Sequence, residues 1–290
     1  MQRNVMMILA AIAAIAVFSA PAFAGSSPWL PAPGGGSITV SYVSQGATEF
    51  YRSTVKGPTP GGGANLSQQT VWVDGVYGLS DSVALDFRVG EARSSFITGE
   101  GLPPSQQSIN GLQDINVGVV WRAVDEVVSS GPSIAFRVAG IKAGNYDTGY
   151  INSLGDGGNG MELSAMVGKF IADRFAVSSE LGYRYRDSSA HEIPSNVFAR
   201  FSAGVLVGGG VGVNLNYEID NSLSGLEIGV PPFSPSRFPE LQEDIHLLGP
   251  TVSFSVSDQA SIAVSYAKVV QGRNTAASNV FSVSFGYSFN

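Results

Sequence analysis

The stretch FSVSFGYSFN, residues 281–290, alternates large apolar residues with small polar ones at every step. Its odd-numbered positions are aromatic or valine, and its even-numbered positions are serine or glycine before the last residue. Successive side chains of a β-strand point to opposite faces, so one face of this strand is apolar and the other is small and polar. The segment before it repeats the pattern, with Ile262, Val264 and Tyr266 on one face. Two such neighbours predict the apolar outside and the polar inside of a membrane barrel.

The same alternation recurs upstream in segments of roughly ten residues, separated by turn residues, as in strands that cross an outer membrane. We predict twelve strands, at residues 37–51, 67–79, 83–97, 111–123, 133–146, 161–172, 174–187, 195–207, 210–220, 243–256, 259–271 and 277–290. Tight turns alternate with longer loops rich in Gly, Pro, Ser and Asn, and an even strand count puts both chain termini in the periplasm. The fold class is therefore all-β, a transmembrane antiparallel up-and-down β-barrel spanning residues 37–290.

The first 24 residues have the three parts of an export signal. Arg3 supplies the positive charge, residues 5–18 are apolar, and Ala22-Phe23-Ala24 is a small-x-small cleavage site. Residues 25–36 are then a short periplasmic segment or a small plug. We expect the mature chain to reside in the bacterial outer membrane.

The composition excludes several function classes. The mature chain carries a net charge of −8, because removal of Arg3 takes one positive charge from −7, and it has no basic run. Nucleic-acid binding is therefore disfavoured. Only 13% of the residues are charged, against about 25% in a typical soluble domain. We predict no cofactor and no metal, because the loop at residues 154–160 lacks the alternating carboxylates of a calcium site.

The positions of the charges favour a barrel over a soluble β-sandwich. Lys169, His246 and Lys268 fall on the expected lipid face. Twelve charged residues share the opposite, lumen face: Asp74, Asp86, Arg88, Asp114, Arg122, Arg137, Glu162, Glu180, Arg184, Arg186, Arg200 and Glu218. They either fill the interior by pairing with one another or line the path of a solute. Arg184, Arg186 and Arg200 are the best candidates for residues that determine solute selectivity. Trp72 also points inward, because it is two residues from Asp74 on the same strand, and it either packs against a plug or lines a hydrophobic site.

Four stretches resemble the outer-membrane family linked to the meta-pathway of phenol degradation, a relative of the FadL-type transporters. These are GLQDI with GVVWR at residues 111–122, GNYDTG at 144–149, LGDGG at 154–158 and ELGYRYR at 180–186. The resemblance implies uptake of small hydrophobic, often aromatic, compounds. It also implies an outer-membrane location.

Two further regions have expected roles. In the last strand Phe285, Tyr287 and Phe289 form the expected insertion signal for the barrel-assembly machinery, although Asn290 follows the final aromatic. The loop at 221–242, here called the lid loop, contains Phe233, Arg237 and Phe238 in a proline-rich stretch. It either folds over the barrel mouth, contacts lipopolysaccharide, or packs on its own turns.

Three functions remain open from the sequence. The first is a passive outer-membrane channel or transporter for small hydrophobic or aromatic compounds, with outer-membrane lipid and lipopolysaccharide as surroundings. The second is a closed barrel that acts as a structural or adhesive surface protein through its loops. The third, a membrane lipid hydrolase, has only His191 and His246 to draw on, and neither has a nucleophile at a fixed offset. We therefore expect a protein that is not an enzyme.

Overall fold

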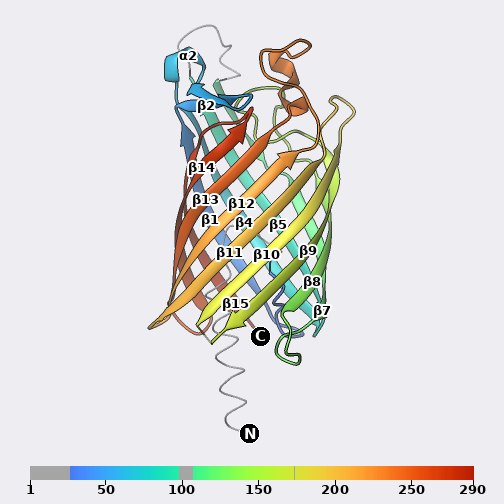
Figure 1. Cartoon of the computed structure of the whole chain (residues 1–290), viewed down its shortest axis with the longest axis vertical. Helices are drawn as coiled ribbons and strands as arrows, with labels where there is room; N and C mark the ends of the chain where they lie inside the picture. The colour runs from blue at the N-terminus through green and yellow to red at the C-terminus, as the bar shows by residue number, and fades with distance from the viewer. Residues whose placement is uncertain (1–26, 98–106, 173) are drawn as a thin grey trace.

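The computed structural model describes residues 27–97, 107–172 and 174–290. The expected export signal lies outside these residues. Figure 1 shows a closed barrel of tilted strands, with the C terminus at one end and α2 (Pro60–Gly63) and β2 (Glu49–Arg52) at the other. The turns at the first end are short, which is the asymmetry of the periplasmic side of outer-membrane barrels. Within the described residues, no helix is long and apolar enough to cross a membrane.

The barrel wall has twelve positions, as predicted. Its strands are β1 (Gly36–Ala47), β4 (Leu66–Ser80), β5 (Val83–Phe96), β6 (Ser108–Leu112), β7 (Ile115–Val124), β8 (Ser133–Lys142), β9 (Asn159–Ile171), β10 (Phe175–Asp187), β11 (Asn196–Gly208), β12 (Val211–Ser222), β13 (Asp244–Ser255), β14 (Ala260–Arg273) and β15 (Asn279–Phe289). Each pairs antiparallel with its neighbour, and β15 closes the ring against β1. β6 and β7 both pair with β5 and together occupy one wall position.

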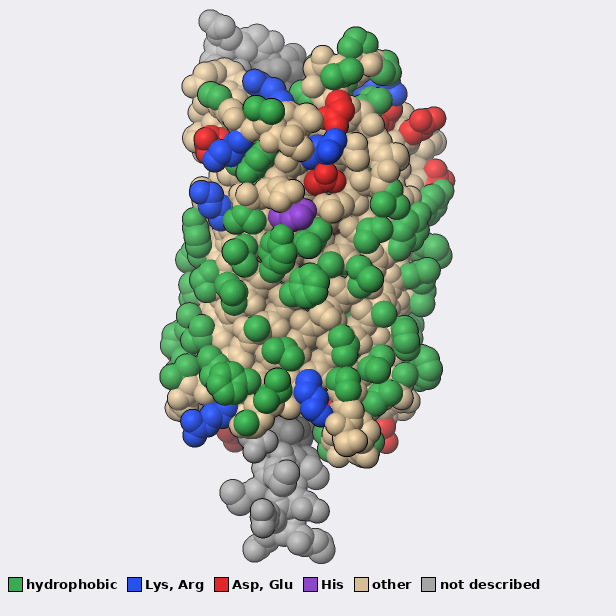
Figure 2. Space-filling view, viewed as in Figure 1, with side chains coloured by type: hydrophobic (Ala, Val, Ile, Leu, Met, Phe, Trp, Pro, Cys, Tyr) green, Lys and Arg blue, Asp and Glu red, His purple; other side chains and the backbone are tan. Residues whose placement is uncertain are grey.

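The outer face is apolar around the middle of the barrel. Figure 2 shows hydrophobic side chains gathered there and charged side chains gathered toward the two ends. Trp121 and Phe285 are about half exposed on this face, where lipid rather than water would cover them. Four charges that parity also puts on the outside, Glu91, Arg93, Lys142 and Asp187, are exposed on this face near the ends of β5, β8 and β10. Near the membrane boundary, charged heads can reach water.

The structure corrects the sequence-derived strands at residues 111–123 and 133–146. The first is two strands, broken at residues 113–114, and the second ends at Lys142. Residues 143–158 turn inward instead of continuing up the wall, and Asn145 pairs with Leu112 at the break. Gly144 makes this turn possible, because a Cβ there would lie 2.0 Å from the carbonyl oxygen of Leu112. The loop at 154–160 is thus not a simple external turn.

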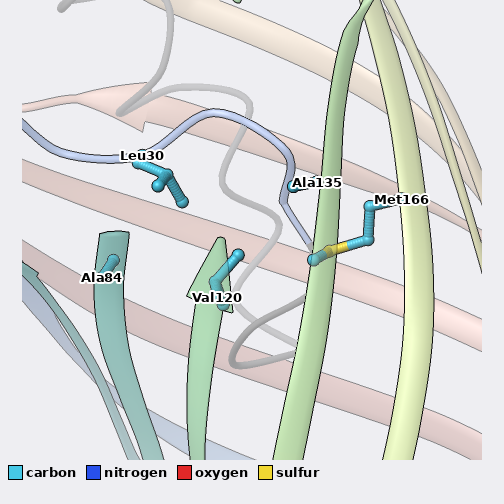
Figure 3. Close-up of a cluster of buried hydrophobic side chains, with 5 residues drawn as sticks. All are labelled: Leu30, Ala84, Val120, Ala135 and Met166. Atoms are coloured by element: carbon cyan, nitrogen blue, oxygen red, sulfur yellow. The ribbon is translucent and has the colours of Figure 1, made fainter. Parts of the chain in front are cut away.

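The first described residues lie inside the barrel at its periplasmic end. Leu30 packs against Ala84, Val120, Ala135 and Met166, which come from strands β5, β7, β8 and β9 (Figure 3). These are inward positions of their strands, so the segment forms a floor under this side of the lumen.

Trp29 anchors the same segment at the wall. Its indole N–H donates to Glu126 Oε1 at 2.6 Å, and its ring lies 4.7 Å from that of Phe170. Gly168 leaves room beside it, because a Cβ at that position would lie 2.7 Å from the Trp29 ring. The periplasmic opening is therefore narrowed by a segment that is held by packing and by a hydrogen bond.

Three segments gather at the opposite, external end. One is the hairpin of β2 with β3 (Val55–Pro58), which contacts the β14–β15 turn through the pair Phe50 and Ala276. The second is the inward-turned loop 143–158. The third is the lid loop between β12 and β13, which contains the 3-10 helix η1 (Pro235–Glu240).

Candidate solute pathway in the barrel lumen

A belt of ion pairs lines the lumen wall from β4 to β12, and Arg137 lies at its centre. This guanidinium donates to Asp86 Oδ1 at 2.5 Å and to Glu162 Oε2 at 2.9 Å, so it links β8 to β5 and β9. The Arg137 side chain is 5% exposed and that of Asp86 is fully buried. Gly118 on β7 provides the room, because a Cβ there would lie 2.8 Å from the guanidinium. Buried charges persist only when paired and hydrogen-bonded, and these are.

Arg184 extends the belt toward β12. Its Nε donates to Glu162 Oε1 and its Nη1 to Asp220 Oδ2, both at 2.6 Å. The Phe198 ring supports it, with the Arg184 guanidinium 5.2 Å and the Arg200 guanidinium 4.7 Å from the ring centre. A guanidinium over an aromatic face is attracted by the ring quadrupole. Phe198 therefore separates two cations while it stabilises both.

Arg200 is the next cation in the belt and has two acidic partners of its own. Its Nη1 lies 2.8 Å from Glu180 Oε2, and its Nε lies 3.3 Å from Glu218 Oε1. At the other end of the belt, Arg88 bonds Asp74 through Nε at 2.6 Å. The belt therefore runs over the wall from β4 to β12.

The Arg88 guanidinium also lies 5.0 Å above the ring of Trp72. Trp72 therefore faces the lumen, on the same side of β4 as Asp74.

The stretches that carry the family resemblance meet above this belt. Asp114, at the break between β6 and β7, accepts hydrogen bonds from the Tyr146 hydroxyl at 2.5 Å and from Arg186. The same hydroxyl accepts the backbone N–H of Gly157 at 3.2 Å. Burial, with the Asp114 carboxylate adding to it, raises the pKa of Tyr146 far above its usual value, so the hydroxyl keeps its proton. These contacts fix the inward course of loop 143–158.

The opposite side of the lumen, from β13 through β14 and β15 to β1, is built differently. Its inward side chains are small, and the buried ones include Ser41, Thr251, Ser253, Ala263, Ser282 and Ser284. We call this side the hydroxyl wall. Ser265 and Ser282 share a hydrogen bond of 2.5 Å between their hydroxyls, and Asn216 on β12 donates to Thr251 at 3.0 Å. Short side chains leave space in front of this wall.

A cavity of about 400 Å³ lies between the belt and the hydroxyl wall. Leu30 and Trp29 line it at the periplasmic end, and Trp72, Glu180 and Arg200 line it at mid-height. The lumen is thus filled by ion pairs on one side and open on the other.

The structure brings eleven of the twelve charges expected in the lumen into the belt or the Asp114 cluster above it. The exception is Arg122, which lies at the periplasmic rim, where it bonds the Asp81 carbonyl at 2.6 Å and Asp125 at 2.7 Å. Sequence reasoning missed Asp220, Asn116 and Phe198. All three share the inward parity of neighbours that were named, Phe198 with Arg200 on the same strand, so parity could have found them.

The lid loop is fastened at several points. Arg273 donates to Glu227 at 2.5 Å and to Asp244 at 3.0 Å. The Asn274 amide donates to the carbonyls of Leu226 and Gln242, at 3.3 and 2.8 Å. These bonds attach the lid loop to the β14–β15 turn.

The residues named from the lid-loop sequence pack within the loop and against one neighbour. The rings of Phe233 and Phe238 meet edge to face, with their centres 5.5 Å apart. Arg237 bonds Glu240, whose other oxygen lies 3.2 Å from His191 Nδ1 in the β10–β11 loop. The Arg237 bond lowers the pKa of Glu240, which therefore stays ionised at neutral pH.

The two histidines have no serine partner among the described residues. His191 contacts Glu240, and His246 lies 2.7 Å from the Tyr217 hydroxyl. Nor do the described residues contain a group of three or more acidic or histidine side chains placed to hold a metal ion.

The comparisons with known proteins agree with this architecture. The COG4313 outer membrane channel from Pseudomonas putida F1 superposes with a TM-score of 0.71 at 14% identity, over 90% of this chain and 98% of that one. The translocator domain of the autotransporter NalP from Neisseria meningitidis gives 0.52 at 11% identity, over 99% and 96%. The KdgM porin in complex with disordered oligogalacturonate gives 0.51 at 10%, over 88% and 99%. The fold is that of an outer-membrane β-barrel.

The particular family is shown by sequence. The family model described as "Putative MetA-pathway of phenol degradation" matches residues 30–285, and the chain belongs to this family. No curated protein sequence matches significantly.

Proposed function

We propose that this chain is a passive outer-membrane channel for small hydrophobic or aromatic compounds. The observation that carries the proposal is the one-sided lumen, in which the hydroxyl wall leaves a cavity of about 400 Å³ in front of the belt. Trp72, Val76 and Leu30 give its lining large apolar side chains. Binding sites for small molecules are typically concave and mostly apolar, with a few placed polar groups. Membership of the family and the likeness in fold to outer-membrane channels support the proposal.

Single-channel recording in planar bilayers tests this function directly. The folded barrel should produce small, discrete conductance steps, because the bore is narrowed but not filled. Deletion of residues 25–35 should enlarge the steps, since the described part of this segment, residues 27–35, covers part of the periplasmic opening as a small plug. Uptake of a radiolabelled aromatic hydrocarbon by cells that produce the barrel gives the second readout. A folded barrel that neither conducts nor increases uptake would contradict the proposal.

The second candidate is a closed surface barrel that acts through its loops. The fastened lid loop, the inward loop 143–158 and the Leu30 segment favour it, because together they obstruct both ends. The two candidates are separated by the deletion of residues 25–35. A barrel closed by the belt and the lid loop would stay silent after the deletion, whereas the proposed channel would conduct more.

The surroundings of the barrel are part of the proposal. We expect residues 1–24 to be removed on export, and Phe285, Tyr287 and Phe289 to serve as the insertion signal read by the barrel-assembly machinery. Replacement of Phe289 by Ser should lower the yield of heat-modifiable barrel, and deletion of Asn290 should leave it unchanged. The exposed rim at the external end would contact lipopolysaccharide.

A further inference from the structure

We propose that the mid-lumen cavity selects uncharged aromatic compounds that carry an O–H or N–H donor, and that Glu180 is the acceptor for this donor. The inference rests on the proposed channel function and names the class of solute that binds within it.

The evidence begins with one unsatisfied oxygen. The Glu180 side chain is 1% exposed, and its Oε2 accepts from Arg200 at 2.8 Å. Its other oxygen, Oε1, is buried with no hydrogen-bond partner among the described residues. Buried acceptors are nearly always paired, because an unpaired one loses its hydration without compensation. Glu180 also lines the cavity, so a donor on a bound solute can supply the missing bond.

Three other acids of the belt show that this is a specific feature of Glu180. Both oxygens of Asp86 accept from Arg137, and both oxygens of Asp74 accept from Arg88. Glu162 divides its oxygens between Arg184 and Arg137. These three acids use both carboxylate oxygens, whereas among the belt acids of the described residues only Glu180 has an oxygen that is buried without a partner.

The cavity surface supplies an aromatic contact across from this oxygen. Trp72 is on β4 and Glu180 is on β10, which lie on opposite walls in the strand order of the barrel. Both line the same cavity, with Leu30 and Val76 on its apolar side. A ring that packs near Trp72 can extend a substituent toward Glu180. A volume of about 400 Å³ is within the usual range for small-molecule sites.

The charges around the cavity argue for an uncharged solute. An anion would meet the carboxylates of Glu180, Glu218 and Asp74. A cation would meet the Arg200 guanidinium, and the acids at this height already have cationic partners in Arg200 and Arg88. A neutral donor avoids both repulsions and still bonds an ionised acceptor, which is the stronger kind of hydrogen bond.

Equilibrium dialysis of the folded, detergent-solubilised barrel tests the site with a matched pair of probes. 2-Naphthol carries the donor, and 2-methoxynaphthalene has the same ring system without it. At about pH 6, where a phenolic hydroxyl is uncharged, naphthol should bind about tenfold more tightly than the ether. In Glu180→Gln the preference should fall to roughly threefold, because a neutral acceptor makes a weaker bond. The anion 2-naphthoate should bind less tightly than either.

The controls separate this site from the channel itself. Glu91→Gln removes the same charge from the outer face of β5 and should keep the full preference, and heat-modifiable migration shows that each variant folds. Equal binding of naphthol and its ether to the parent, or an unchanged preference in Glu180→Gln, would overturn the site. If conductance and uptake persist in that case, the channel function stands without it. If the preference is found in a barrel that neither conducts nor takes up solute, the site stands and the channel function fails.

Discussion

The belt and the hydroxyl wall face the same bore and obey the same strand periodicity, yet they fill it in different ways. From β4 to β12 the inward positions carry long charged side chains, each guanidinium held by one or two carboxylates. From β13 to β1 they carry mostly serine, threonine and alanine, with Val43, Leu247 and Val280 among them, and no charged residue among the described buried ones. Alternation therefore specifies which side chains point inward. Their length specifies where the interior is solid and where it is open.

The difference also separates stability from permeation. Side chains of the belt hold one another, so the removal of one leaves a buried charge without a partner. Side chains of the hydroxyl wall make few bonds, and their main contribution is the volume that they leave free. Substitutions that remove a belt charge should therefore lower the free energy of unfolding, and substitutions that enlarge a side chain of the hydroxyl wall should narrow the bore.

The largest expected effect is on stability, in Arg137→Met. This change leaves the buried carboxylates of Asp86 and Glu162 without their shared cation and should lower the free energy of unfolding by ~3–5 kcal/mol. Ser282→Ala in the hydroxyl wall removes a single hydroxyl bond and should cost about 1 kcal/mol. Urea unfolding in lipid vesicles, followed by the heat-modifiable gel shift, measures both. Equal losses in the two variants would show that the walls do not differ in this way.

Much of this comparison could be predicted from the sequence. The parity of residues such as Arg137 and Glu162 is a local property of each strand, so the strands, their faces and the inward charges follow from the residue pattern. The pairing of Arg137 with Asp86 is not local, because it depends on register across β5, β7 and β8. The same register determines which acid has a carboxylate oxygen without a hydrogen-bond partner, as Glu180 has.

The inward turn of loop 143–158 was harder to foresee. The residues that hold it, Asp114, Tyr146 and Arg186, lie in stretches that were recognised only one by one. The residue pattern predicts a strand that ends at Tyr146, whereas the strand ends at Lys142. The strand ends earlier because the half-buried Asp114 carboxylate at the wall break bonds the Tyr146 hydroxyl and the Gly144 N–H.

The second prediction concerns conductance and adds bulk to the hydroxyl wall. Ser265→Phe places a ring in the open half of the bore and should reduce single-channel conductance severalfold while the barrel still folds. Val264→Phe is the matched control, since the neighbouring side chain is exposed on the lipid face of the same strand. If both variants lower the conductance equally, or if neither lowers it, the ion path does not run along the hydroxyl wall.

A smaller effect is expected on ion selectivity. Seven carboxylates and five guanidiniums occupy the belt and the Asp114 cluster: Asp74, Asp86, Asp114, Glu162, Glu180, Glu218 and Asp220 against Arg88, Arg137, Arg184, Arg186 and Arg200. The excess of acid should make the channel cation-selective. Replacement of Arg184, Arg186 or Arg200 by Gln should increase that preference. A reversal potential that reports anion selectivity in the parent would show that the arginines, rather than the acids, dominate the field.

The smallest effect should be a pH-dependent step at the mouth, where Glu243 precedes β13. Burial raises the pKa of Glu243 to about 8, the carboxylates of Asp156, Asp220 and Asp244 add to the rise, and a bond from Thr275 opposes it. The folded barrel therefore keeps a proton that the unfolded chain releases near its ordinary pKa of 4.5. The free energy of unfolding should accordingly fall as the pH rises from 4.5 toward about 8.

The same titration changes the charge at the mouth. Above about pH 8 the Glu243 carboxylate is ionised, so cation selectivity should increase across this pH and Glu243→Gln should abolish the increase. Glu240→Gln is the control, because the Arg237 bond lowers the pKa of Glu240 and its charge does not change in this range. Reversal potentials measured below and above about pH 8 in the parent and in both variants test whether Glu243 causes the increase in cation selectivity. A step that survives in Glu243→Gln would assign the titration to another group.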